Sequence, residues 1–111
     1  MDSKLISWDK KEVSLLIKVY FDIMNDPLHK EKLVSDLSAD LRKYAINLGY
    51  EIDERHRNIN GITMCLQMIG NLVTGNGLKP THLQKEVYEL YVNNTEEFNK
   101  LLHNYGGFTD W

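Results

Sequence analysis

The hydrophobic positions of this chain recur every three to four residues, which is the spacing of amphipathic α-helices. Asp9 and Glu12 open the first such segment with the spacing of a capping box, and Trp8 and Val13 flank them as in a hydrophobic staple. Asn25-Asp26-Pro27 marks the end of this segment. The pattern therefore predicts a first helix from about residue 10 to residue 25. Its apolar stripe is Val13, Leu16, Ile17, Tyr20 and Met24.

A second periodic segment runs from about His29 to Leu48, and Gly49 is well placed to end it. Ser38 could instead cap a separate, shorter helix, so the pattern allows either one helix or two in this segment. The apolar stripe that supports both interpretations is Leu33, Leu37, Leu41, Tyr44, Ala45 and Leu48.

The stretch from Asn58 to Leu78 contains no Asp, Glu, Lys or Arg, although 26% of all residues in the chain are charged. Within it, the residues that share one helical face are apolar, namely Ile62, Leu66, Ile69 and Val73. We expect a third helix from about Asn58 to Val73, and its lack of charge predicts a central and mostly buried position. Cys65 lies beside the apolar face and is interpreted as a core residue rather than a reactive thiol.

Two capping signatures predict the remaining helices. Thr81 and Gln84 have the spacing of a second capping box, and Asn94 and Glu97 repeat it before a short last helix. Because no segment alternates like a strand, the chain is predicted to be all-α. We expect a single compact domain of four to five helices over residues 1–111, with a core at about 8–105 and a flexible tail at 106–111.

Composition limits the setting and the chemistry of this chain. Its 111 residues suit one domain, and its net charge of −3 disfavours general coating of nucleic acid. A single cysteine forms no internal disulfide, and the polar N-terminus is not typical of a signal peptide, so a cytoplasmic location is expected. No run approaches a membrane span. Abundant Asn, Ile and Lys, whose codons are rich in A and T, point to a low-GC bacterium or its phage.

The sequence contains no recognisable catalytic or metal-binding motif. The four histidines are not within helical reach of each other, and no cysteine pair accompanies them; they are His29, His56, His82 and His103. Acidic pairs at Asp53-Glu54 and Glu96-Glu97 are typical of solvated surface segments. We therefore expect no enzymatic activity, no metal, no cofactor and no small-molecule substrate.

Two patterns resemble known families. The opening from Trp8 to Phe21, followed later by Arg55-His56-Arg57 before the third segment, resembles Myb/SANT-like three-helix domains. Residues 8–104 are also similar to a small helical module at the N-termini of bacterial restriction or HNH-type proteins. That second likeness rests on an Arg-Asn-x-x-Gly-Ile-x-Met pattern, matched by Arg57, Asn58, Gly61, Ile62 and Met64. The Myb-like resemblance implies nucleic-acid binding, and the second one implies an association with defence proteins.

Two functional hypotheses follow, and the first is a protein-binding module or small inhibitor, associated with phage or defence. It rests on the acidity of the chain, its lack of catalytic motifs and its small size. The partner is expected to be a protein, either another chain or a second copy in a homodimer. The residues expected to bind it are Tyr50, Ile52, Met64, Met68, Phe108 and Trp111.

The alternative hypothesis is a Myb-like or helix-turn-helix module that binds DNA through the basic turn at Arg55-Arg57. The residues expected to take part are Arg42, Lys43, Arg55, Arg57, Asn60 and Gln67. The uncharged third segment disfavours this alternative, because recognition helices normally offer cations to phosphates. The two hypotheses differ in whether these four cations converge on one face.

Overall fold

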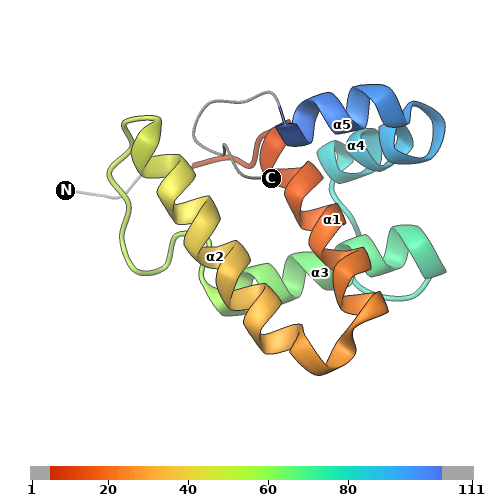
Figure 1. Ribbon diagram of the computed structural model, residues 1–111, viewed down its shortest axis with the longest axis horizontal. Coiled ribbons are helices and arrows are strands. Elements are labelled where there is room, and N and C mark those ends of the chain that lie inside the picture. Colours follow the sequence, from red (N-terminus) through yellow and green to blue (C-terminus); the bar gives the residue numbers. More distant parts are fainter. Residues whose placement is uncertain (1–5, 104–111) are drawn as a thin grey trace.

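The computed structural model describes residues 6–103, and all regular structure in this range is helical (Figure 1). A 3-10 turn, η1 (Pro27–His29), separates the first two of five α-helices. The helices are α1 (Lys10–Asn25), α2 (Lys30–Asn47), α3 (Ile59–Thr74), α4 (His82–Asn93) and α5 (Thr95–His103). The all-α prediction is thus confirmed. The question left open for residues 29–48 is also answered, because α2 is one continuous helix. The predicted tail 106–111 lies outside the described residues.

The helix starts follow the capping signatures. Asp9 caps α1, since its Oδ1 accepts from the backbone N–H of Glu12 at 2.8 Å, and Glu12 Oε1 accepts from the Asp9 N–H at 3.1 Å. Thr81 and Gln84 form the same reciprocal pair at the start of α4. Asn94 accepts from the N–H of Glu97 before α5. The three predicted caps are therefore confirmed.

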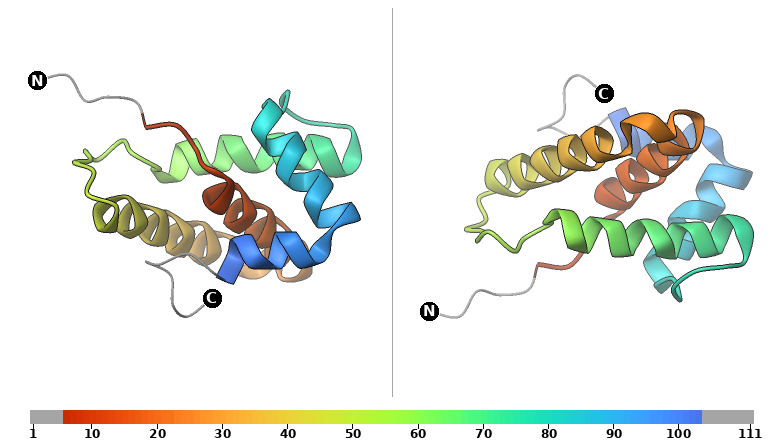
Figure 2. Two further views of the ribbon diagram at one scale, coloured as in Figure 1. Left: turned by 90° about the horizontal axis from the view of Figure 1, so that it is seen from above. Right: turned by 90° about the horizontal axis from the view of Figure 1, so that it is seen from below.

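The central element of the fold is α1 rather than α3. Figure 2 shows α1 in the middle of the other helices, and it contacts all four of them, whereas α3 contacts α1, α2 and α4. The uncharged composition of the third helix therefore led to a wrong prediction of its position. Ile62, Leu66 and Ile69 are nevertheless buried as expected, on the face of α3 that packs against the core.

The polar side chains of α1 are buried because each has a partner. Lys11 Nζ donates to the carbonyl of Leu102 near the end of α5, where a cation also suits the helix dipole. Ser14 Oγ donates to the carbonyl of Lys11 at 2.6 Å. Burying a polar group is costly only when it lacks a partner, so these residues allow α1 to be enclosed. The buried residues of α1 are Lys11, Glu12, Val13, Ser14, Leu15, Leu16, Ile17 and Val19.

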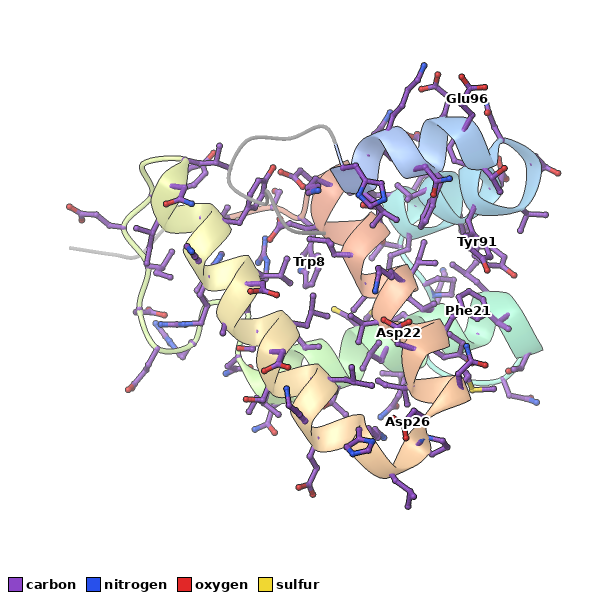
Figure 3. All side chains as sticks on the ribbon, in the orientation of Figure 1. Trp8, Phe21, Asp22, Asp26, Tyr91 and Glu96 are labelled. Atoms are coloured by element: carbon purple, nitrogen blue, oxygen red, sulfur yellow. The ribbon has the colours of Figure 1, made fainter. Side chains whose placement is uncertain are left out.

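An aromatic cluster joins α1 to α4 and α5. Phe21 and Tyr91 lie side by side between α1 and α4 (Figure 3), stacked with ring centroids 4.9 Å apart. Tyr91 also meets Phe98 of α5 edge to face at 5.1 Å. Such pairs contribute beyond the area they bury. The cluster therefore fixes α4 and α5 on one side of α1, while α2 and α3 occupy the other sides.

The loop after α3 folds back against that helix. Gly77 has a φ of 139°, and a Cβ at this position would lie 2.4 Å from the carbonyl oxygen of Gln67, so only glycine fits. Asn71 Nδ2 donates to the Gly77 carbonyl at 3.1 Å. The end of the uncharged stretch thus packs beside the C-terminal half of α3.

Candidate functional site

Arg57, in the basic turn before α3, points into the protein. Its Nε donates to Glu12 Oε2 at 2.7 Å, and the two side chains are only 7% and 4% exposed. Its Nη2 donates to Glu12 Oε1 at 3.0 Å and to the carbonyl of Ile6 at 3.1 Å. The guanidinium also lies 4.4 Å from the ring centroid of Trp8, as a cation–π contact. Arg57 is therefore a buried link between α1 and the turn before α3.

Arg42 is also used inside the fold. Its Nη1 donates to the carbonyls of Asp53 at 2.9 Å and His56 at 2.7 Å. Ser38 Oγ donates to the carbonyl of Arg57 at 2.7 Å. Two side chains of α2 thereby satisfy the backbone of the connection between α2 and α3, which lacks helical hydrogen bonds of its own.

The four cations of the nucleic-acid hypothesis do not converge on one surface. Arg57 and Arg42 bind groups within the chain, whereas Lys43 is exposed on α2. Arg55 is 78% exposed and pairs with the neighbouring Asp53 at 3.1 Å. The basic turn that the sequence indicated is therefore largely structural, and the assignment of Arg42 and Arg57 to a DNA-binding surface is corrected.

A small pocket opens beside this buried link. It has a volume of about 80 Å³ and is lined by residues that include Asp9, Tyr44, Tyr50 and His56. Tyr44 Oη donates to Asp9 Oδ2 at 2.7 Å, so the most acidic part of the pocket is already paired. Drug-sized ligands occupy sites of about 300–1,000 Å³. The volume suits ordered water rather than a small-molecule substrate.

His56 makes the stability of the fold sensitive to pH. Its Nε2 is buried without a hydrogen-bond partner among residues 6–103. Burial, and then the nearby charges of Arg57 and Arg42, lower the pKa of His56 below its usual 6.5. The unfolded chain therefore binds a proton on acidification before the folded chain does. The free energy of unfolding must then fall as the pH drops through about 6.5, and must level off below the folded pKa.

We expect the wild type to lose more stability than His56→Gln between about pH 8 and about pH 5, the range in which histidine titrates. Urea unfolding of both proteins at several pH values measures this difference. The other titrating groups are common to both proteins, so they cancel in the comparison. Parallel stability profiles would show that His56 does not carry this dependence.

The outer face of α3 is the largest surface feature that the sequence pattern leaves unexplained. Asn60, Met64, Gln67 and Asn71 follow each other at helical spacing, opposite the buried stripe of this helix. Met64 is 53% exposed. Every position on this face is uncharged, so burial within the chain does not account for the absence of charge between Asn58 and Leu78.

Few side-chain polar groups on this face are used within the chain. Thr63 and Thr74 direct their hydroxyls to the carbonyls four residues earlier, at 2.8 Å each, and so turn methyl groups outward. The amides of Asn60 and Gln67 have no hydrogen-bond partner among the described residues. These two amides, with Met64 between them, are available to an external surface.

The other residues expected to bind a partner are not gathered at this face. Tyr50 is half exposed and Ile52 is half-buried in the connection after α2. Met68 is half-buried, and its sulfur accepts from Gln84 Nε2 at 3.4 Å, so it belongs to the contact between α3 and α4. Phe108 and Trp111 lie outside the described residues. Of the predicted set, Met64 alone lies at the centre of an uncharged exposed face.

Neither metal chemistry nor a membrane span is indicated in the described part of the chain. Residues 6–103 contain no group of three His, Cys, Asp or Glu side chains placed to hold a metal ion. Within the same range, no helix combines the length and the apolar character needed to cross a membrane. Cys65 is half-buried, and burial raises the pKa of its thiol, which disfavours the reactive thiolate.

Comparisons with protein-family models, with curated proteins and with solved structures find no match to this chain. The function is therefore argued from the residues and their geometry.

Proposed function

We propose that this chain is a non-enzymatic protein-binding module. The outer face of α3, defined by Asn60, Met64, Gln67 and Asn71, would dock on a protein surface that is likewise poor in charge. The observation that carries this proposal is a helix face that is exposed and yet carries no charge. A charged partner surface would lose its solvation here without gaining a counter-ion, which is costly.

Exposed helix positions normally carry charged residues, because charge keeps a surface soluble at no cost in packing. Asn60, Met64 and Gln67 are open to solvent and could hold Lys or Glu without disturbing the core. The cores of protein–protein interfaces are depleted in charged residues and enriched in methionine. A methionine also adapts its shape to a partner. The composition of this face is thus the composition of an interface core.

The same geometry disfavours nucleic acid as the partner. Binding to phosphates requires cations that face outward, and these supply most of the affinity. Arg42 and Arg57 donate to groups inside the chain, α3 has no cation, and the net charge is −3. Asn60 and Gln67 could contact bases, but little would hold a duplex against them. A protein partner needs none of these cations.

The resemblance at Arg57, Asn58, Gly61, Ile62 and Met64 supports a phage or defence setting for this interaction. A chain with a single half-buried cysteine also suits a reducing cytoplasm.

Photo-cross-linking in the source cells tests the proposal. A photoreactive amino acid is placed at Met64 and, as a matched control, at Met24 of α1, which is 58% exposed but lies near charged Asp22 and Asp26. A protein adduct that forms from position 64 and not from position 24 supports the proposed function, whether the adduct is another protein or the same chain. Nucleic-acid adducts, or equal yields from both positions, would contradict it.

A further inference from the structure

We propose that the partner of the α3 face is a second copy of this chain. The two α3 helices would pair antiparallel about a two-fold axis that passes close to Met64. This inference rests on the proposed function and names its partner.

Self-pairing explains why the face lacks charge altogether. A two-fold contact uses the same surface on both copies, so residues at the axis meet themselves. A Lys or Glu there would face an identical charge, and like charges across an interface are repulsive. A contact with a different protein could instead use charges of opposite sign. An exposed face with no charge of either sign is therefore the composition that a self-complementary surface requires.

The register of the amides fits this pairing. Asn60 lies four residues before Met64, and Gln67 lies three residues after it. In an antiparallel pair centred on Met64, Asn60 of one copy comes opposite Gln67 of the second copy, and symmetry repeats this pair on the other side. Each amide carries both donors and an acceptor. The two can therefore donate to and accept from each other, and neither is used among the described residues.

The apolar part of the contact lies at and around the axis. Met64 would meet its own counterpart, and Ile59 is 52% exposed near the start of the helix. The methyl groups of Thr63 and Thr74 face outward because their hydroxyls bond to backbone carbonyls. α3 has 16 residues, so the contact is about 24 Å long. A single helix pair of this length places the interface in the small, transient class. We expect a dissociation constant on the order of 10–100 µM.

Charge exchange at the axis tests this inference. Sedimentation equilibrium of the full chain should show concentration-dependent dimers for the wild type and for the matched control Met24→Lys. Met64→Lys and Met64→Glu should each be monomeric, because like charges would meet at the axis. An equimolar mixture of these two variants should associate again, because Lys of one copy then faces Glu of the other. Only a surface that pairs with itself at Met64 predicts this rescue.

Three outcomes would overturn the inference. They are a wild type that stays monomeric up to about 1 mM, a dimer that survives in Met64→Lys, and a mixture of the Lys and Glu variants that stays monomeric. A monomeric wild type together with a cross-link from position 64 to a different protein would leave the proposed function standing. Circular dichroism establishes that each variant is folded before its mass is measured.

A second variant keeps the test decisive if a charge at position 64 unfolds the chain. Met64→Cys in a Cys65→Ser background should form a disulfide-linked dimer under mild oxidation, since position 64 faces itself. Met24→Cys in the same background should stay monomeric. Equal cross-linking of the two variants, or none in either, would contradict the pairing.

Discussion

Replacing Arg57 with alanine is expected to lower the free energy of unfolding by about 3–5 kcal/mol, because it breaks a buried ion pair by removing one partner. Glu12 would keep a charge that is 4% exposed and has lost both guanidinium donors. The ring of Trp8 would lose its stacked cation, and the carbonyl of Ile6 would lose a donor. Urea unfolding followed by circular dichroism at neutral pH measures the loss.

Two further variants separate the buried pair from charge in general. Arg55→Ala should change stability by less than about 0.5 kcal/mol, since its side chain is 78% exposed. The double variant Glu12→Gln/Arg57→Met should recover a large part of the loss, because it removes both charges and keeps an N3 residue that suits the capping box. If Arg57→Ala and Arg55→Ala cost the same, the buried pair does not hold the turn before α3.

The helix boundaries were predictable from the sequence because capping is a local interaction. Asp9 with Glu12, and Thr81 with Gln84, satisfy each other within three residues, and both pairs form as expected. The partner of Arg57 was not predictable, since Glu12 lies 45 residues earlier along the chain. No periodicity relates two such positions. The basic turn therefore looked available to a ligand, although folding uses most of it.

The position of α3 could not be predicted for a related reason. Lack of charge permits burial but does not require it, because burial depends on how many neighbours surround a helix. Lys11 and Glu12 made α1 look peripheral, and both are buried because Leu102 and Arg57 supply partners. Met64 was correctly predicted to be exposed, whereas Met68 is half-buried in the contact between α3 and α4. The charge-free outer face thus became informative only when the fold left it uncovered.

The two faces of α3 should respond differently to truncation. Leu66→Ala is expected to cost about 2–5 kcal/mol, because Leu66 is buried against the core and its loss leaves a cavity. Met64→Ala should change the stability of the monomer by less than about 0.5 kcal/mol, since it removes a side chain that faces solvent. Urea unfolding at low micromolar concentration measures both, and the dilution keeps self-association from stabilising the wild type.

Raising the protein concentration should then change one variant and not the other. If α3 pairs with itself through Met64, the wild type and Leu66→Ala gain stability on concentration, because dimer formation draws on the folded state alone. Met64→Ala should gain less, since it lacks the side chain at the axis. A Leu66→Ala loss below about 1 kcal/mol would place the wrong face of α3 in the core. A large dilute-solution loss in Met64→Ala would mean that its outer face supports the fold rather than a partner.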